Sequence, residues 1–409
     1  MPSRFLFCCA VVAFVLAPQF GHAKSRAREV GVPFEGTPGP LNAITDVAGV
    51  EVGHVTLISG DGKLAVGRGP VRTGVTAILP RGKNPGAPPV FAATFSLNGN
   101  GEMTGTAWIE ESGFLEGPMM FTNTHSVGVV RDAVIAWRNQ KSGRDLGDVS
   151  WSLPVVAETW DGWLSDINGF HVKPEHVFRA IDEARSGPVA EGGVGGGTGM
   201  VSYEFKGGIG TASRRLGADL GGYTLGVLVQ ANHGVRRQLT IAGVPVGREI
   251  GGGHRRFAGS DSTNLAAVSV GETGSILIAL ATDAPLLPHQ LKRLARRASL
   301  GLARTGAVSG NGSGDLFIAF STANASGAAR ETASGEIGFA PSTFQALTNE
   351  AMSPLFESTV EAVEEAIVNA LVAGEKMTGR DDHVVDALPI PRLREILEKY
   401  HRLAPDAAR

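Results

Sequence analysis

A glycine and a serine stand where a polar stretch meets an apolar one, at Gly274-Ser275. The residues before them, 251–271, are rich in glycine and polar side chains and predict a long exposed loop. Ile276 to Ala281 is a short apolar run typical of a buried strand. A cut between the two residues would give Ser275 a free α-amine beside its own hydroxyl, and an amine with a pKa of about 8 can take the hydroxyl proton without a histidine. The junction therefore suits a self-cleaving hydrolase, although a serine in a turn before a strand is by itself more often structural.

Other polar side chains stand at the ends of expected strands. Glu158 lies near the end of an apolar run, Asn232 follows another, and Ser313 and Asp315 precede a third. Taken singly, each of them has the ordinary explanation that strand ends commonly carry polar caps. Their chemistry becomes meaningful only if the fold brings them together.

The remaining motifs argue against other kinds of site. The glycine string 192–199 lacks the Lys-Ser/Thr ending of a phosphate loop, so it predicts a tight backbone wall beside a small pocket. His125, His171 and His233 are widely separated and no His-Glu-x-x-His motif occurs, so we expect no metal and no cofactor. A Ser-His-Asp triad stays open, but the Gly-x-Ser-x-Gly motif followed by a helix is missing.

The hydrophobic periodicity predicts glycine-punctuated strands and helices in separate blocks. This arrangement favours an α+β fold with layered sheets and helices over alternating βαβ units. The helix expected at 288–304 carries a basic face, which we interpret as solvated or as a subunit contact. The expected strands are 50–58, 75–79, 223–229, 276–281 and 316–320, and the expected helices are 126–137, 174–184, 288–304, 353–374 and 393–400.

Residues 1–23 have the pattern of a secretory signal peptide. Arg4 precedes an apolar run from Phe5 to Leu16, and Gly21-His22-Ala23 forms a small-residue cleavage site. The run is too short for a comfortable transmembrane helix. We therefore expect cleavage near Ala23 and a mature chain of residues 24–409.

The two cysteines, Cys8 and Cys9, both lie within this leader. The mature chain would thus hold neither a thiol nor a disulfide, and an export signal without cysteines suits a bacterial periplasm. The formal net charge is −3, which becomes −4 when the single positive charge of Arg4 is removed. An acidic chain predicts no binding to nucleic acid and no attraction to an anionic membrane.

With these features the chain resembles a known family, the L-aminopeptidase/D-amidase-esterases and β-peptidyl aminopeptidases. The resemblance extends over essentially the whole mature sequence, in long and ordered matches. These are 31–36, 41–47, 69–76, 153–159, 187–192, 195–200, 205–211, 229–234, 281–286 and 377–379.

The resemblance implies a four-layer αββα sandwich similar to the N-terminal-nucleophile hydrolases. It also implies that the precursor cuts itself between Gly274 and Ser275 into two subunits, residues 24–274 and 275–409, that stay together. Homo-oligomers, with a tetramer favoured, are expected from the same likeness.

Residue roles follow from the resemblance position by position. Ser275 would be the nucleophile and the new N-terminus, and Ser313 and Asp315 would handle protons. Asn232 would contribute to the oxyanion hole, and Glu158 would receive the free amino group of the substrate. Some members carry glutamate where this chain has Asp315, which is one methylene shorter.

The expected activity is that of an aminopeptidase or amidase acting on short peptides, amides or esters, with L-, D- or β-amino acid residues within its range. Two alternatives belong to other classes. An acyl transferase of the ornithine acetyltransferase type uses threonine at the cut, and a non-catalytic periplasmic amine-binding protein would have a two-lobed βαβ pattern. Denaturing electrophoresis separates the last alternative from the others, because only the self-cleaving proteins would give two bands.

Overall fold

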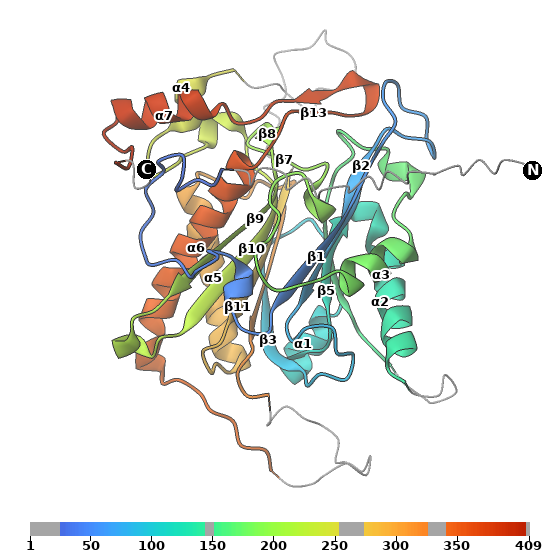
Figure 1. Cartoon of the computed structure of the whole chain (residues 1–409), viewed down its shortest axis with the longest axis vertical. Helices are drawn as coiled ribbons and strands as arrows, with labels where there is room; N and C mark the ends of the chain where they lie inside the picture. Colours follow the sequence, from blue (N-terminus) through green and yellow to red (C-terminus); the bar gives the residue numbers. More distant parts are fainter. Residues whose placement is uncertain (1–24, 144–150, 253–273, 326–340, 406–409) are drawn as a thin grey trace, which may run out of the picture.

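The computed structural model describes residues 25–143, 151–252, 274–325 and 341–405, and two β-sheets lie face to face at its centre (Figure 1). The smaller sheet has the strand order β1-β2-β5-β6, with β5 and β6 parallel. Its outer face packs against helices α2 and α3 through alternate apolar side chains. These elements are β1 (Glu51–Ser59), β2 (Val71–Leu79), β5 (Met119–Asn123), β6 (Val155–Thr159), α2 (Val127–Lys141) and α3 (Pro174–Asp182).

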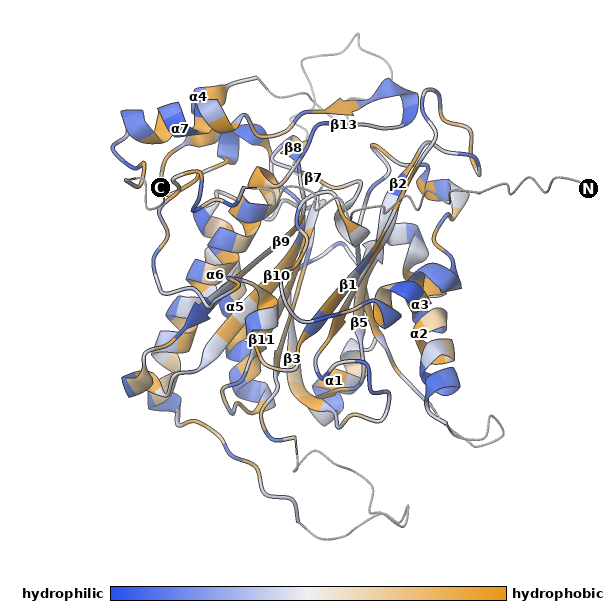
Figure 2. Cartoon of the chain, viewed as in Figure 1, coloured by the Kyte–Doolittle hydropathy of each residue, from blue (hydrophilic) through white to orange (hydrophobic). Residues whose placement is uncertain are grey.

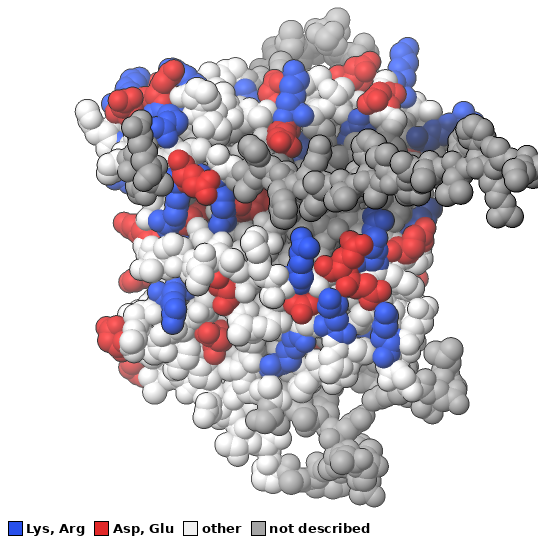
Figure 3. All heavy atoms as spheres, in the orientation of Figure 1, with Lys and Arg blue, Asp and Glu red and all other residues white. Residues whose placement is uncertain are grey.

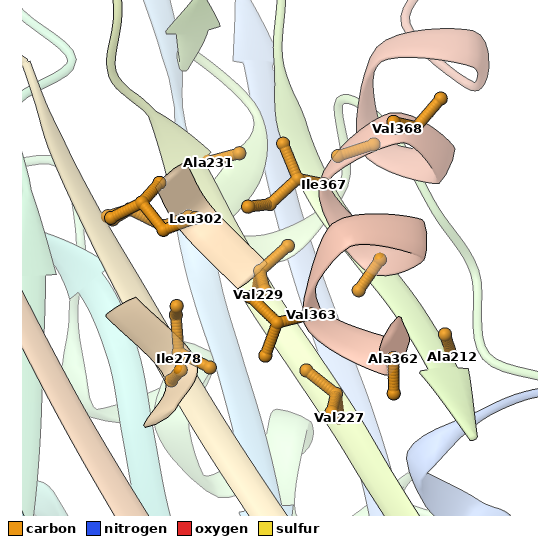
Figure 4. Packing of buried hydrophobic residues seen from close by; sticks show 14 of the residues in the cluster. Ala212, Val227, Val229, Ala231, Ile278, Leu302, Ala362, Val363, Ile367 and Val368 are labelled. Carbon is orange, nitrogen blue, oxygen red and sulfur yellow. The ribbon is translucent and has the colours of Figure 1, made fainter. Parts of the chain in front are cut away.

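The larger sheet has six strands in the order β4-β3-β12-β11-β10-β9, with β11 and β12 parallel. Helices α5 and α6 cover its outer face, where Val229 of β10 packs in one cluster with Leu302 of α5 and Ile367 of α6 (Figure 4). The elements are β4 (Phe114–Leu115), β3 (Val90–Gly99), β12 (Gly314–Ser321), β11 (Ser275–Thr282), β10 (Thr224–Asn232), β9 (Gly208–Arg215), α5 (Pro288–Arg304) and α6 (Ser353–Val372).

A separate apolar cluster fills the space between the two sheets. It includes Phe121 and Ala157 from the smaller sheet and Leu228, Leu277 and Ile318 from the larger one, all fully buried. The strands are therefore apolar on both faces, whereas the covering helices show hydrophilic residues along their outer sides (Figure 2). The predicted α+β four-layer αββα sandwich is confirmed.

Shorter elements lie around this sandwich. They are α1 (Thr106–Ser112), α4 (Val246–Ile250), α7 (Ile390–Lys399), the ribbon of β7 (Val201–Ser202) and β8 (Phe205–Lys206), the ribbon of β13 (Met377–Thr378) and β14 (Val384–Val385), and the 3-10 turns Ile44–Asp46, Thr124–Ser126, Ile167–Gly169, Gly195–Gly197, Ala218–Leu220, Arg236–Gln238, Asn349–Met352 and Arg380–Asp382.

Strand β9, Gly208–Arg215, is not among the strands expected from the sequence, and it contains two glycines. Glycine is needed there because α6 packs very closely: a Cβ at Gly210 would lie 2.0 Å from the Ala366 carbonyl oxygen. The helix expected at 353–374 is α6, which begins at Ser353 with Met352 as its N-cap and ends at Val372.

The segments on the two sides of Gly274-Ser275 are interleaved in one sheet. Strand β11 pairs with β10, which precedes the junction, and β12 pairs with β3. A cut at this junction would therefore leave the ladders of the larger sheet in place.

Acidic and basic side chains intermingle on the molecular face in Figure 3. This distribution gives no single-sign field on that face. Within the described residues, no helix has the length and apolar character needed to cross a bilayer.

Candidate active site

The sheet topology brings three of the polar strand ends together at one end of the larger sheet. Asn232 ends β10 directly opposite Ser275, the first residue of β11. On the other side of β11, Ile276 is the register partner of Asp315 in the parallel strand β12. The central strands thus deliver a hydroxyl, an amide and a carboxylate to one place.

Ser275 is buried, and its Oγ accepts a hydrogen bond of 3.0 Å from the backbone N–H of Gly314. Next to it, Ser313 Oγ donates to Asp315 Oδ1 at 2.7 Å, and the N–H of Ile276 donates to the same oxygen at 3.3 Å. Burial raises the pKa of Asp315, and these hydrogen bonds partly oppose the rise. The shorter aspartate side chain therefore reaches Ser313 without difficulty.

The side-chain amide of Asn232 is held on both sides. Val201 N–H donates to its Oδ1 at 2.8 Å, and its Nδ2 donates to the Trp160 carbonyl oxygen at 3.0 Å. An amide carries two N–H groups, so this arrangement fixes the group and leaves a second donor. A neutral, preoriented donor is what a developing oxyanion requires.

Glu158 lies near the end of β6, as predicted, and its carboxylate is buried. The Thr124 hydroxyl donates to Oε2, and the backbone N–H of Glu102 donates to Oε1 at 3.0 Å. Burial raises the pKa of Glu158, and both hydrogen bonds partly oppose the rise. A carboxylate of this kind can pair with an ammonium group.

Gly101 has no side chain, and the space beside it is bordered by Glu158 and by Gly314. A Cβ at this position would lie 3.3 Å from Glu158 Oε1 and 3.3 Å from the Cα of Gly314. Gly314 is the residue whose N–H contacts Ser275. The Glu158 carboxylate and Gly314 therefore border the same small space at Gly101, and Gly314 in turn contacts Ser275.

Gly274 packs against the neighbouring strand. A Cβ on it would lie 1.9 Å from the Asn232 carbonyl oxygen, so the absence of a side chain allows this close approach. The loop predicted before it, 251–271, lies mostly outside the described residues, as do residues 1–24.

Several contributors to this site gave no signal in the sequence. They act through backbone groups or through loops distant in the chain, such as the Gly314 N–H, the Trp160 carbonyl and the Thr124 hydroxyl. Asp161 was also overlooked, although it is fully buried, and burial raises its pKa to about 7.

The histidines have other surroundings. His125 stacks on Phe170, and His171 Nε2 lies 2.9 Å from Asp166 Oδ2. His233 is buried against Tyr203, and burial lowers its pKa to about 3. In the described ranges, no three His, Cys, Asp or Glu side chains gather in a way that could hold a metal ion.

The glycine string packs tightly between the two sheets. A Cβ at Gly197 would lie 2.5 Å from the Ile209 nitrogen, and one at Gly199 would lie 2.3 Å from the Arg72 carbonyl oxygen. The predicted close-packed backbone wall therefore exists. Its last residues lead directly to Val201, which binds Asn232.

Known aminopeptidases resemble this chain in sequence and in fold. The chain is 53% identical over 405 residues to β-peptidyl aminopeptidase BapA of Sphingosinicella microcystinivorans, covering 97% of this chain and 98% of that one. The solved L-aminopeptidase D-Ala-esterase/amidase of Ochrobactrum anthropi, described as a variant of the Ntn-hydrolase fold, superposes with a TM-score of 0.82 at 47% identity, covering 93% and 99%. A solved β-aminopeptidase of Burkholderia sp. superposes with a TM-score of 0.79 at 48% identity, covering 92% and 99%.

The sandwich and its similarity to these enzymes define a serine aminopeptidase with an N-terminal-nucleophile type of fold. The model of peptidase family S58 matches residues 42–385. The chain belongs to this family, and the resemblance inferred from its motifs is confirmed.

Proposed function

We propose that the protein is an exported, self-processing aminopeptidase that releases the N-terminal residue of short peptides, amides or esters through a serine acyl-enzyme. One observation carries the proposal: a buried carboxylate, Glu158, borders the same small space at Gly101 as Gly314, whose N–H contacts Ser275 Oγ. An ammonium held by Glu158 would place the first carbonyl of the substrate beside the serine. Internal peptide bonds have no such ammonium, so the enzyme would act as an exopeptidase.

The first step is a cut between Gly274 and Ser275 into residues 24–274 and 275–409. Cleavage frees the α-amine of Ser275 beside its own Oγ. Asp315 Oδ2 has no hydrogen-bond partner among the described residues, so it can accept from the resulting ammonium while Oδ1 holds Ser313. Interleaving of the two segments in one sheet supports their staying together after the cut.

In turnover, the α-amine of Ser275 takes the proton of Oγ, and Oγ attacks the substrate carbonyl carbon. Asn232 donates to the oxygen that becomes negatively charged. The proton passes to the departing amine or alcohol as the bond to it breaks, which leaves an ester on Ser275. Water, deprotonated by the same amine, then hydrolyses the ester and releases the amino acid.

The substrate range follows from the relatives. One is named a β-peptidyl aminopeptidase and another an L-aminopeptidase D-Ala-esterase/amidase. We extend both descriptions to this chain and propose that it accepts N-terminal L-residues together with D- or β-amino acid residues. Family membership and serine at the junction favour this activity over an acyl transferase or a non-catalytic binding protein.

The Ser275→Ala variant tests the proposal. It should remain a single uncut chain on a denaturing gel and should release no p-nitroaniline from an amino-acid p-nitroanilide. The Ser299→Ala variant, which changes a half-buried serine on α5, is a matched control and should process and turn over normally. A processed and active Ser275→Ala enzyme would exclude Ser275 as the nucleophile.

A second measurement addresses the free amino group. Hydrolysis of alaninamide is compared with hydrolysis of its N-acetylated form, which carries no charge for Glu158 to bind. We expect the acetylated compound to react at least about 100-fold more slowly, because a desolvated charge pair contributes several kcal/mol. Equal rates for the two compounds would show that the enzyme does not recognise the free amino group.

We further propose that residues 1–23 direct export to the periplasm and that the processed enzyme forms a homo-oligomer, with a tetramer favoured. The charged start, apolar run and small-residue ending of the leader support export. Mass spectrometry of the periplasmic fraction should find an N-terminus near Lys24, and light scattering should give about four copies. A cytoplasmic protein that retains Met1 would contradict the first proposal, and a monomer would contradict the second.

A further inference from the structure

Lys206, at the end of the short strand β8, is fully buried beside the glycine-rich residues 192–199, called here the glycine wall. Its Nζ donates to three backbone carbonyl oxygens, those of Gly207 at 2.7 Å, Met200 at 2.9 Å and Gly197 at 3.2 Å. A neutral amine has only two N–H groups, so three donated hydrogen bonds require the ammonium form. A positive charge is therefore held inside the molecule by carbonyl dipoles.

The peptide group between Met200 and Val201 joins this charge to the candidate oxyanion hole. Its carbonyl oxygen accepts from Lys206 Nζ, and its N–H donates to Asn232 Oδ1 at 2.8 Å. The amide of Asn232 in turn offers its N–H groups on the side of Trp160, whose carbonyl oxygen accepts one of them. Ammonium, peptide and side-chain amide thus form one continuous chain of hydrogen bonds.

We propose that Lys206 is a positioning residue that orients and polarises the Asn232 amide through the Met200–Val201 peptide. Hydrogen bonds in such a chain strengthen one another, because each acceptor that is polarised becomes a better donor at its far side. The ammonium withdraws electron density from the peptide, and the peptide N–H withdraws it from the Asn232 carbonyl. The remaining N–H of Asn232 then binds a developing oxyanion more strongly, while the site itself gains no cation that would repel the substrate ammonium.

Other contacts hold the same peptide in place. The Met200 sulfur accepts from the Thr159 hydroxyl at 2.8 Å, and Thr159 Oγ1 accepts from Gln230 Nε2 at 2.7 Å. The Gly207 N–H also donates to the Met200 carbonyl oxygen at 3.0 Å, so the peptide keeps a hydrogen bond at this oxygen even without the lysine. This makes the electrostatic contribution of Lys206 separable from mere support of the loop.

The test compares Lys206→Met and Asn232→Ala, singly and together, on protein that has completed self-cleavage. The inference rests on the proposed function, in which Asn232 binds the oxyanion. We expect Lys206→Met to lower kcat by about 10- to 100-fold with KM within about threefold, since only the transition state carries the charge that the polarised amide stabilises. Asn232→Ala should lower kcat by about 100- to 1000-fold, and adding Lys206→Met to it should cost less than about threefold more.

A boronic acid analogue of alanine, whose boron becomes tetrahedral when Ser275 Oγ adds to it, provides a readout that structural support alone would not move. Its binding should weaken in Lys206→Met by the same factor as kcat/KM, while binding of the product alanine stays within about threefold of the parent. The Thr198→Val variant is the matched control, because it removes a hydrogen bond of 2.6 Å to Gly195 in the same glycine wall and leaves the Met200–Val201 peptide untouched. It should keep kcat within about threefold.

The outcomes are distinguishable. An unchanged kcat in Asn232→Ala would overturn the oxyanion role in the proposed function itself. Normal loss in Asn232→Ala with a fully additive loss in the double variant, or with an equal loss in Thr198→Val, would overturn the inference about Lys206 alone. If Lys206→Met does not fold, the Lys206→Arg variant is measured instead. It keeps the positive charge and should retain kcat within about fivefold. A processed Lys206→Arg enzyme with a 100-fold loss of kcat at unchanged KM would contradict polarisation by charge.

Discussion

Asn232 and Ser275 are direct register partners at the open ends of the antiparallel strands β10 and β11. One belongs to the segment before the Gly274-Ser275 junction and the other to the segment after it. Because nine and eight residues of continuous strand fix this pair, its geometry is set by the sheet and not by the loop that leads to the junction. The proposed cut can therefore change the chemistry of Ser275 while the amide opposite stays in place.

The first prediction concerns the contact between the two segments. Glu365 of α6 is completely buried and binds Arg214 Nη1 at 2.8 Å, Arg28 Nε at 2.8 Å and Asn42 Nδ2 at 2.6 Å. All three partners precede the junction. Glu365→Gln should destabilise the processed protein by up to about 3–5 kcal/mol, because it removes the charge that Arg214 and Arg28 share, and Arg214 then keeps only Glu361 at 3.2 Å. Urea denaturation, with subunit separation followed by size exclusion, measures this loss.

The adjacent Glu364 supplies the control. It pairs with Arg304 at 3.1 Å, and both residues follow the junction, so Glu364→Gln should have a much smaller effect on subunit separation. Burial alone would raise the pKa of Glu365, but Arg28 and Arg214 hold it below its usual value of 4.5. The stabilisation that ionised Glu365 gives to the folded protein is therefore present above pH 4.5, and it is lost as the pH falls through the lowered pKa of Glu365. Equal losses in the two variants would show that Glu365 does not join the segments.

The second prediction concerns the pH dependence of substrate binding. Burial raises the pKa of Glu158, so this carboxyl takes up a proton at a higher pH than an exposed glutamate would. Only the ionised form pairs with an ammonium, and kcat/KM should therefore fall on acidification, beginning above the ordinary glutamate pKa. Glu158→Gln should lower kcat/KM by at least about 100-fold and abolish this part of the acid limb.

The neighbouring Glu102 gives a matched variant. Its charge raises the pKa of Glu158, while its backbone N–H holds the Glu158 carboxylate. Glu102→Gln removes the charge and keeps the N–H, so the acid limb should move to lower pH with little change at its plateau. An acid limb that survives unchanged in Glu158→Gln would assign it to another group.

Much of the sandwich could be predicted because its signals are local. The apolar run 276–281 and the amphipathic stretch 288–304 became β11 and α5 with boundaries within about two residues of those expected. Strand β9 was not predicted because its glycines are required by tertiary packing, namely the close approach of α6 at Gly210. Turn propensity and packing against a helix select the same residue type, and the sequence alone does not separate them.

The positions of the candidate site residues could be predicted for the same reason, because they too follow from local signals. Asn232, Ser275, Ser313 and Asp315 stand at strand ends, so their positions in the chain suggested chemistry, and strand pairing brings them together. The contribution of Gly314 is a backbone N–H, which every residue type except proline supplies. Lys206 lies on a two-stranded ribbon, and its three carbonyl acceptors exist only once the glycine wall has folded.

The third prediction concerns Asp161, a carboxyl that is fully buried next to Thr73 and Asn123. Burial raises its pKa from 3.8 to about 7, and those two side chains oppose the rise only in part. Below pH 3.8 the folded and unfolded forms are both protonated and the group costs nothing. As the pH rises towards 7 the unfolded form ionises first, so stability is lost, by an amount on the order of 4 kcal/mol at most.

Asp161→Asn removes this titration while keeping the shape of the side chain. Thermal unfolding measured between pH 4 and 8 should show the variant gaining stability relative to the parent as the pH rises. Asp219→Asn, at an exposed position, should follow the parent curve. Parallel curves for Asp161→Asn and the parent would mean that Asp161 does not hold a proton in this range.

The last prediction concerns the general base. No histidine contacts Ser275 among the described hydrogen bonds: His171 binds Asp166, and His233 is buried with its pKa lowered to about 3. If the α-amine of Ser275 is the base, single substitutions of His125, His171 and His233 by glutamine should each keep kcat within about tenfold of the parent, or roughly 1.4 kcal/mol of barrier. The rise of kcat with pH should persist in all three, because the amine that must lose its proton is unchanged. His233→Gln should in addition lower the unfolding temperature, since it disturbs a buried aromatic contact with Tyr203. A thousandfold loss of kcat in any one variant, in protein that is folded and processed, would identify a histidine base and refute the α-amine mechanism.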